Sequence, residues 1–478
     1  MQNIASTHAF RKREDASGNG EGETSGVSEV SRPIRKTGEP GRFDLSKEAA
    51  AERAALKADS DHQEREGDLP LWFAFQGPDI ATRLGAGVLS TKAQKAINRL
   101  VPAIVSAGEC GRSLSISRSK TWWAGTQRYH GTGYQAIRDG LDFLASHGWI
   151  CMEVPPPAGP IGWQTTLTPS LALYEAVQGV ALHACPLELI IMKDQHKRLM
   201  GYRDDRDTSR LRREVRQSQE FLSSANINLA RVQAVAIKQS GGLYVFEGVN
   251  RAGERTQTFV DLARPWSHRV IHNNGDWRQG GRIYLPVQNL PRSVRRQLEI
   301  DGEPVTEPDF SEQHVRMLYA RVGHPMPQGR AYVLDNFRWP DWVQSDKRRT
   351  ILKRTILIMV NASTTHAAAG AVERVIYDLC PYSMLRRSEA RSLARAVIKA
   401  MQEKHHAISE FICSGEGLRL QRQDRDIMLR VLKDTRDRGI AAIPVHDSVM
   451  CSASQADRVR EIMDKHGAPY GCKVSDPQ

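Results

Sequence analysis

A chain of 478 residues is too long for one ordinary domain, so its length predicts two or three folded units. Its net charge of +12 and a pI near 9.4 favour a polyanionic partner such as nucleic acid. It has no apolar run of about 18 residues, which argues against a membrane span, and its first residues lack the apolar core of a secretory signal. Seven well-separated cysteines suggest neither a zinc site nor a disulfide framework, so a reducing, cytoplasmic setting is expected.

The chain divides by composition and pattern into four parts. Residues 1–66 are rich in Gly, Ser and charged residues and poor in aromatic residues. Such a segment cannot bury enough apolar surface to fold alone, so it is predicted to be a disordered tail. The other three parts are residues 67–180, 181–240 and 241–478.

Residues 67–180 have the pattern of a winged-helix-like module. A helical stretch at 91–109 leads into a basic, aromatic loop and a second amphipathic helix at 134–147. Two strand-like runs then flank a Pro/Gly-rich turn at 155–162. Helices followed by such a hairpin are typical of a winged helix, a module that often binds DNA.

Basic and aromatic side chains gather around the loop of this module and suit contact with DNA phosphates. The candidates are Arg112, Arg118, Lys120, Trp122, Trp123 and Arg128. An alternative is that the module only packs against protein. The following part, 181–240, is mostly charged between 205 and 236, with apolar positions too sparse for a buried core. It is expected to be a helical linker or a thumb-like arm resting on a duplex.

Asp309 lies in the first of three segments within 241–478 that could carry chemistry. Short apolar residues lead up to it, Ser311 is a good N-cap, and an apolar stripe from Val315 to Val322 marks the helix that follows. Asp309 is therefore expected at the junction between a strand and a helix. At such a junction a carboxylate can face solvent while its backbone is held rigidly. Taken alone, the segment would be read in preference as an ordinary aspartate in a strand-to-helix turn.

Asp447 lies in the second segment. Apolar runs at 440–445 and 449–451 flank His446 and Asp447, which predicts a tight hairpin with Asp447 at its tip. Helical patterns precede and follow the hairpin, so it is expected to belong to a half-covered antiparallel sheet. An ordinary turn is again the alternative.

The third segment, residues 345–363, predicts a helix that presents cations. Arg349 and Lys353 are four residues apart and project from the same side, and Asn361 lies about 80° round from Lys353. A solvated basic face is the plain alternative. However, most other positions are apolar, which indicates a well-buried helix whose charges need a partner, and phosphate is the natural one.

Phosphoryl transfer from a nucleoside triphosphate uses two metal ions, roughly 4 Å apart and held by carboxylates, together with cations that neutralise the leaving pyrophosphate. The three segments supply this set of groups. Two Mg²⁺ ions, a template–primer duplex and nucleoside triphosphates are therefore the expected cofactors and partners, whereas the oligomeric state is not predicted. No segment by itself is strong evidence for phosphoryl transfer, but the order and spacing of the three segments are.

That order resembles the palm and fingers of A-family DNA polymerases and of the related single-subunit, phage-type RNA polymerases. Residues 309–311 with Arg316 are similar to the first palm motif of the DNA enzymes, and residues 349–354 resemble the fingers-helix motif. Residues 445–448 resemble the second palm motif in the His-Asp-Ser form typical of the RNA enzymes. A stretch at 280–291 is similar to the Gly-Arg and Gln-Asn-Ile-Pro run that precedes the first palm motif.

The resemblance covers about residues 270–470 and implies an α+β fold, in which a palm with an antiparallel sheet and helical fingers follows the winged-helix-like module. It also implies a role for each matched residue. Asp309 and Asp447 would be the catalytic, metal-binding carboxylates. The nucleotide-binding residues would be Arg349, Lys353, Asn361 and His314. The primer–template contacts would come from Arg282, His446, Gln288 and Arg316.

Four positions depart from the family pattern. Asn361 and Ala362 replace the usual Tyr-Gly of the fingers, His314 replaces the Glu that excludes a ribose hydroxyl, and Ser448 replaces the Glu after His-Asp. The choice between dNTPs and NTPs therefore cannot be read from these residues. Fidelity is expected to be low because the aromatic platform at 361 is missing.

The leading hypothesis is a DNA-directed DNA polymerase, and replication of a mobile element or a phage would be a suitable setting. The nearest alternative is an RNA polymerase or a primase-like enzyme. A second alternative is a non-catalytic DNA-binding replication initiator with a polymerase-like body. A metal-dependent nuclease would explain the carboxylates but would leave the fingers helix without a purpose.

Overall fold

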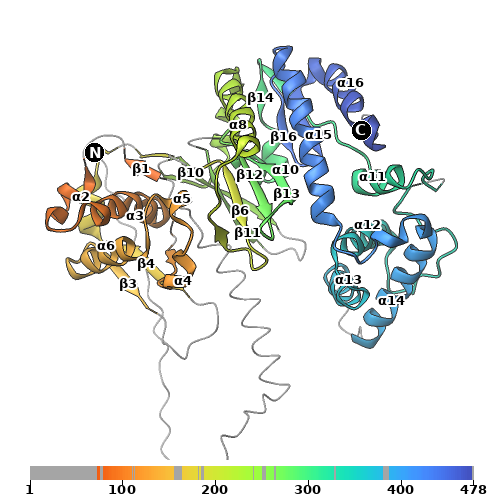
Figure 1. The fold of residues 1–478 in the computed structure, drawn as a ribbon, viewed down its shortest axis with the longest axis horizontal. Helices are drawn as coiled ribbons and strands as arrows, with labels where there is room; N and C mark the ends of the chain where they lie inside the picture. Colours follow the sequence, from red (N-terminus) through yellow and green to blue (C-terminus); the bar gives the residue numbers. More distant parts are fainter. Residues whose placement is uncertain are drawn as a thin grey trace, which may run out of the picture. The chain divides into compact units, whose positions relative to one another are not determined.

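The computed structural model describes residues 73–75, 79–109, 111, 113–154, 164–180, 182–184, 188–240, 242–249, 255–262, 265–327, 330–380 and 387–475. The predicted tail at 1–66 lies outside these residues, and so do Arg112 and the whole of the Pro/Gly-rich turn at 155–162. The described chain mixes helices with several small sheets, most of whose strands pair antiparallel (Figure 1). None of its helices combines the length and the apolar character needed to cross a membrane.

Residues 79–180 build one small core of helices and strands. Its elements are α2 (Ile80–Arg83), η1 (Ala86–Val88), α3 (Thr91–Glu109), β2 (Leu114–Ile116), α4 (Lys120–Trp123), α5 (Gln127–His130), α6 (Tyr134–Ser146), β3 (Ile150–Glu153), β4 (Thr165–Pro169) and α7 (Leu171–Val177). The strands form an antiparallel sheet in the order β2-β4-β3. Helices α3 and α6 pack together, with Ile97, Leu100, Leu141 and Leu144 fully buried. Both helices predicted for this region are therefore present.

Three further sheets follow or flank this core. β1 (Phe73–Phe75) pairs with β5 (Leu182–Ala184). A four-stranded sheet has the order β13-β12-β6-β7, from β6 (Ile190–Lys193), β7 (Leu199–Met200), β12 (Arg269–Asn273) and β13 (Asp276–Tyr284). A three-stranded sheet contains β9 (Lys238–Ser240), β10 (Leu243–Val249) and β11 (Arg255–Asp261). In the four-stranded sheet β6 and β12 run parallel, whereas the other pairs are antiparallel.

Two glycines in β13 allow the irregular pairing of that strand with β12. Gly280 and Gly281 have φ values of +70° and +85°, which favour glycine. A Cβ at Gly280 would lie 2.2 Å from the side-chain nitrogen of Asn273, and one at Gly281 would lie 2.9 Å from the ring of His272. The bulge is thus specified by sequence, and it sets the direction of Arg282, the next residue.

A five-stranded antiparallel sheet joins segments that lie far apart in the chain. Its order is β16-β17-β15-β14-β8, from β8 (Ile227–Asn228), β14 (Glu299–Ile300), β15 (Glu303–Thr306), β16 (Ile443–Val445) and β17 (Ser448–Ser452). The predicted hairpin at 443–452 is therefore present and belongs to an antiparallel sheet. Nearby, α15 (Gly417–Asp437) packs against β13, and α16 (Ala456–Gly467) packs against both α15 and β17 (Figure 1).

The remaining helices lie mainly between the two aspartate segments. They are η2 (Pro286–Asn289), α10 (Arg292–Arg295), α11 (Gln313–Arg321), α12 (Ser345–Asn361), α13 (Thr365–Leu379), α14 (Arg387–Lys404), η3 (His406–Phe411), η4 (Ala453–Gln455) and η5 (Ala468–Tyr470). α12, α13 and α14 pack against one another. Helix α12 follows the predicted span closely. By contrast, Ser311 does not cap α11, because the residue before that helix is Glu312 in a left-handed conformation with φ +53°.

The charged stretch at 205–236 differs from its prediction. It forms α8 (Arg206–Ser224), then β8 and the short helix α9 (Ala230–Ala234), because the backbone turns extended at Ala225. Val215 and Leu222 are nearly fully buried in the main core, so α8 does supply a core-facing stripe. The expectation that its apolar positions were too sparse for burial is wrong, since residues at helical spacing need only one face to pack.

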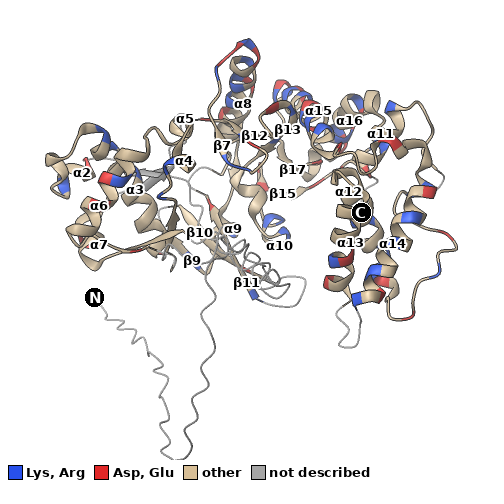
Figure 2. Ribbon diagram, turned by 60° about the horizontal axis from the view of Figure 1, so that its bottom comes forward, with Lys and Arg blue, Asp and Glu red and all other residues tan. Residues whose placement is uncertain are grey.

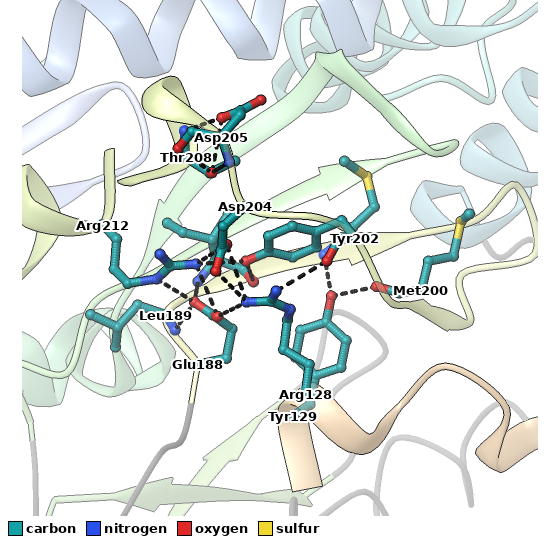
Figure 3. Close-up of polar contacts among 12 residues, drawn as sticks. Arg128, Tyr129, Glu188, Leu189, Met200, Tyr202, Asp204, Asp205, Thr208 and Arg212 are labelled. Atoms are coloured by element: carbon teal, nitrogen blue, oxygen red, sulfur yellow. Dashed lines mark hydrogen bonds and ion pairs between the residues drawn. The ribbon is translucent and has the colours of Figure 1, made fainter. Parts of the chain in front are cut away.

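A cluster of ion pairs joins α5 to β6 and α8 (Figure 3). The buried carboxylate of Glu188 accepts from Arg128 at 2.8 Å and from Arg212 at 3.0 and 3.1 Å. The exposed carboxylate of Asp204 pairs with the same two guanidinium groups. The Tyr129 hydroxyl donates to the carbonyl of Met200, which adds a neutral contact to the junction. The guanidinium of Arg128 therefore forms its ion pairs with carboxylates of its own chain.

Replacing Glu188 with Gln should lower the free energy of unfolding by about 2 kcal/mol, because Arg128 and Arg212 would lose charged hydrogen bonds to a buried carboxylate and keep only Asp204. Burial alone would raise the pKa of Glu188, but hydrogen bonds from Arg212, Arg128 and a backbone N–H lower it below its ordinary value of 4.5. The stabilisation is therefore complete above pH 4.5 and is lost as the pH falls through the folded-state pKa. Urea unfolding at several pH values measures both effects.

The matched control is Asp142→Asn. Asp142 pairs with Arg118 at 3.0 Å, but both side chains are substantially exposed, so the change should stay within about 0.5 kcal/mol. Equal losses for the two variants would contradict the assignment of a stabilising role to the Glu188 cluster.

Candidate functional site

The five-stranded sheet brings Asp309 next to Asp447. The backbone N–H of Phe310 donates to the carbonyl of Asp447 at 3.0 Å, and Asp309 pairs with Ser448 as an isolated antiparallel bridge. Both aspartates line one cavity of about 790 Å³. Two residues 138 positions apart in sequence thus lie on adjacent backbone segments and face the same space.

Two side-chain hydrogen bonds support the hairpin that carries Asp447. Ser448 donates from its hydroxyl to Glu307 at 2.8 Å, and the side-chain amide of Gln288 donates to the carbonyl of Pro444 at 2.7 Å. His446, which also lines the cavity, has φ +59°, a left-handed conformation that is uncommon outside glycine. A residue keeps such an unfavourable conformation only where the surrounding contacts hold its backbone in place. Residues of this kind are often found at functional sites.

Helix α12 presents one polar side to the cavity. Arg349, Lys353, Leu357 and Asn361 recur every four residues and all line it. The opposite side is buried, through Ile351, Leu352, Thr355, Ile356, Met359 and Val360. The predicted separation of a cationic face from an apolar face is therefore present. Its physical cause is burial of one face against α13, α14 and α15.

Arg282 connects the cavity to a buried acid on α15. Its Nε donates to Asp424 at 2.7 Å, and its Nη2 lies 3.3 Å from Nε2 of His314. Burial raises the pKa of Asp424 to about 6, while Arg282 opposes that rise. Burial and the nearby guanidinium lower the pKa of His314 to about 3, so His314 is neutral at physiological pH, with Nε2 as an acceptor and its proton on Nδ1.

The cavity concentrates positive charge. Six cationic side chains line it, namely Arg282, Arg316, Arg330, Arg349, Lys353 and Lys473. Three carboxylates line it, namely Asp309, Glu312 and Asp447. Burial lowers the pKa of both lining histidines, His314 and His446, so they are neutral and the lining carries an excess of three positive charges. On α8, α13 and α14, by contrast, Lys and Arg are interspersed with Asp and Glu (Figure 2). A polyanion is the ligand class that such a cavity favours.

Several cavity residues were not predicted from sequence. Glu312 accepts from the backbone N–H of Ala331 at 2.8 Å and pairs with Arg316 at 3.5 Å, so it ties the start of α11 to a later loop. The further unpredicted lining residues are Phe310, Ser311, Gln313, Arg330, Tyr332, Leu357, Gln421, Lys473, Val474 and Ser475. Most lie in irregular segments or belong to the last described residues, where no periodic pattern marks them.

The last described residues run alongside the first aspartate. Phe310 pairs with Val474 as an isolated bridge, and the backbone N–H of Ser475 donates to the carbonyl of Asp309 at 2.8 Å. The Ser475 hydroxyl also hydrogen-bonds to the carboxylate of Asp309. The chain near its C-terminus therefore fixes the backbone of Asp309 from the side opposite Asp447.

Most residues predicted for the site line the cavity, and one does not. Asp309, Asp447, Arg349, Lys353, Asn361, His314, Arg282, His446 and Arg316 all line it. Gln288 does not. Its amide supports the β16–β17 hairpin instead of facing the cavity.

The residues predicted for DNA contact in the 67–180 region lie in different environments. Trp123 is 3% exposed and donates from its indole to the carbonyl of Ser117. Arg118 pairs with Asp142, and Arg128 belongs to the Glu188 cluster. Lys120 is exposed and Trp122 is half-buried. The basic character of this loop in the sequence is thus partly neutralised by acids elsewhere in the chain.

Among the described residues no group of three or more His, Cys, Asp and Glu side chains could hold a metal ion by itself. Asp309 and Asp447 are a two-carboxylate set. Magnesium is commonly held by one or two carboxylates, with waters and substrate phosphates completing its octahedral coordination. The donor types present therefore fit Mg²⁺ bound together with a phosphate ligand.

No protein-family model matches the sequence, and no curated protein matches it. Among solved structures, the chain is similar to the POL domain of Pol1 from M. smegmatis in complex with a DNA primer–template and dNTP. The sequence identity is 12% and the TM-score 0.27, over 83% of this chain and 71% of that chain. A likeness at that level establishes no family.

Proposed function

We propose that this protein is a template-directed nucleic-acid polymerase, and more specifically a DNA-directed DNA polymerase that uses Mg²⁺. One observation carries the proposal: a single cavity is lined by Asp309 and Asp447 from adjacent backbone segments and by Arg349 and Lys353 from α12. Carboxylates beside a row of cations are the groups that nucleotidyl transfer requires.

Each set of residues has a distinct task. Asp309 and Asp447 would hold two magnesium ions, which would supply Lewis-acid stabilisation of the reacting phosphate and of the primer hydroxyl. Arg349 and Lys353 would bind the triphosphate and neutralise the charge that develops on pyrophosphate. His446 and Arg282 would contact the primer terminus, with His314 and Asn361 beside the nucleotide and Arg316 supporting the first aspartate.

For residues 67–180 we propose a winged-helix-like module that contacts DNA. The order of α3, β2, α4–α6, β3 and β4 and the three-stranded sheet support this assignment. Fewer residues are proposed to contact DNA than the sequence suggested, because Trp123 is buried and Arg128 is ion-paired inside the protein. Arg118, whose partner Asp142 is exposed, is retained with Lys120 and Trp122 as a DNA-contacting residue, and Arg112 lies outside the described residues.

A primer-extension assay tests the proposal. Purified protein, Mg²⁺ and a labelled primer on a DNA template should give extension with dNTPs, and none when EDTA is present. Parallel reactions use NTPs and an RNA template. Extension with NTPs alone would overturn the DNA assignment and favour an RNA polymerase or primase. Duplex binding without any incorporation would favour the non-catalytic initiator.

A further inference from the structure

Tyr332 is an aromatic residue in the cavity that no sequence motif marks. It lies in the segment between α11 and α12, the residue is 6% exposed, and it lines the same cavity as Asp309 and Asp447. Burial, with Glu312 and Asp447 acting in the same direction, raises the pKa of its hydroxyl, so the ring stays neutral at any physiological pH.

The backbone on both sides of Tyr332 is held by hydrogen bonds. The N–H of Ala331 donates to Glu312, and Nε2 of His405 lies 3.1 Å from the carbonyl of Ala331. The ammonium of Lys404 donates to two carbonyls in this segment, at 3.2 and 2.6 Å; they belong to Arg330 and Val333. Residues at the start of α11 and at the end of α14 thus hold the backbone of the segment that carries the Tyr332 ring.

The two cations on α12 that face the cavity both lie over this ring. The guanidinium carbon of Arg349 is 5.9 Å from the ring centroid, and the ammonium of Lys353 is 6.0 Å from it. Both distances are at the outer limit of a cation–π interaction. Long cationic side chains lose considerable rotamer freedom when they bind a ligand, so a partner that already restricts them lowers the cost of binding.

We propose that Tyr332 is a positioning residue that orders Arg349 and Lys353 for binding the polyphosphate of an incoming nucleotide. The proposal rests on the proposed function, since it assigns the polyphosphate as the ligand of those two cations. Tyr332 acts through the cations rather than on the reacting atoms. Its ring should therefore govern nucleotide affinity more than the maximal rate.

The test compares Tyr332→Phe, Tyr332→Leu and the wild type in two assays. In primer extension, the Leu variant should raise the KM for dNTP roughly tenfold, with kcat changed less than threefold, because cation–π contacts contribute modestly to each cation. The Phe variant keeps the ring and should restore a KM near that of the wild type. In a binding assay without turnover, affinity for inorganic tripolyphosphate should fall in the Leu variant and not in the Phe variant.

Tyr470→Leu is the matched control. The Tyr470 ring also faces an arginine, with the Arg430 guanidinium carbon 5.6 Å from the centroid, but it does not line the cavity. This variant should leave both the KM and tripolyphosphate affinity unchanged. Thermal unfolding of each variant reports whether loss of packing, rather than loss of positioning, explains an effect.

A double-mutant comparison keeps the proposal falsifiable if Tyr332→Leu also lowers stability. With Lys353→Met already present, adding Tyr332→Leu should cost clearly less affinity than it does alone, because one of its two targets is gone. An unchanged KM and unchanged tripolyphosphate affinity in Tyr332→Leu would overturn the proposal. The proposal would also be overturned if Tyr332→Leu cost the same affinity in the presence of Lys353→Met as it does alone. If the wild type binds tripolyphosphate but incorporates no nucleotide, the polymerase assignment fails, and the binding assay alone decides the role of Tyr332.

Discussion

Replacing Asp447 with Asn should reduce nucleotide incorporation on the order of a thousandfold or more while leaving primer–template affinity nearly unchanged. Asn has nearly the shape of Asp but no charge, so the variant removes a magnesium ligand without creating a void. Metal ions supply several kcal/mol of charge stabilisation in the transition state, and each 1.36 kcal/mol is a factor of about ten in rate.

The structure explains why the fold should survive this change. The contact that links Asp447 to Phe310 is made by its backbone carbonyl, and the hairpin is supported through Ser448 and Gln288. None of these contacts uses the carboxylate of Asp447. Asp309→Asn should have the same effect on incorporation, although its carboxylate also accepts a hydrogen bond from Ser475.

Asp457→Asn is the control for both aspartates. Asp457 lies on α16 with its side chain 93% exposed and pairs with Arg460 outside the cavity. Single-turnover incorporation and duplex binding should both match the wild type in this variant. Incorporation within tenfold of the wild type in Asp447→Asn would show that this carboxylate does not hold an essential metal.

Replacing Lys353 with Ala should raise the KM for the nucleotide roughly ten- to a hundredfold, because hydrogen bonds to charged groups typically contribute about 1.5–3 kcal/mol. Lys353 projects from the cavity side of α12, between Arg349 and Leu357. The remaining cations keep part of the attraction for the triphosphate, so a measurable kcat should remain. Steady-state kinetics at varied dNTP concentration measure both constants.

Lys347→Ala is a control on the same helix. Lys347 lies in the first turn of α12, pairs with Asp346 at 2.9 Å and does not line the cavity. Its removal changes the net charge of the protein by the same amount as Lys353→Ala. Equal effects of the two substitutions would indicate that general charge, rather than a specific contact with the nucleotide, governs the KM.

The sequence predicted the elements that carry the strongest local patterns. A tight two-residue turn between apolar runs identified the hairpin with Asp447 at its tip, and the structure has that hairpin at 443–452. Spacing by four residues identified the cavity face of α12, through Arg349 and Lys353. These features depend on residues close together in the chain, so they can be recognised without knowledge of the rest of the fold.

Partners distant in the chain could not be predicted in this way. Arg128 was a plausible DNA contact as a basic residue in an aromatic loop, yet its ion partners are Glu188 and Asp204, which come 60 and 76 residues later. Tyr332 lies in an irregular segment, where a tyrosine has no pattern to distinguish a cavity residue from a surface one. In both cases packing between separate elements sets the role of the side chain.

The sequence by itself determined the two aspartates, the cationic helix between them and their order along the chain. The residues themselves did not establish that these groups share one cavity, which the resemblance implied and the structure shows. Tertiary structure alone decided that the buried Asp424 is the partner of Arg282 and that Gln288 supports the hairpin. The physical reason is that periodicity and turn residues encode local conformation over a few residues. Strand order and side-chain partners depend on burying apolar surface across the whole chain.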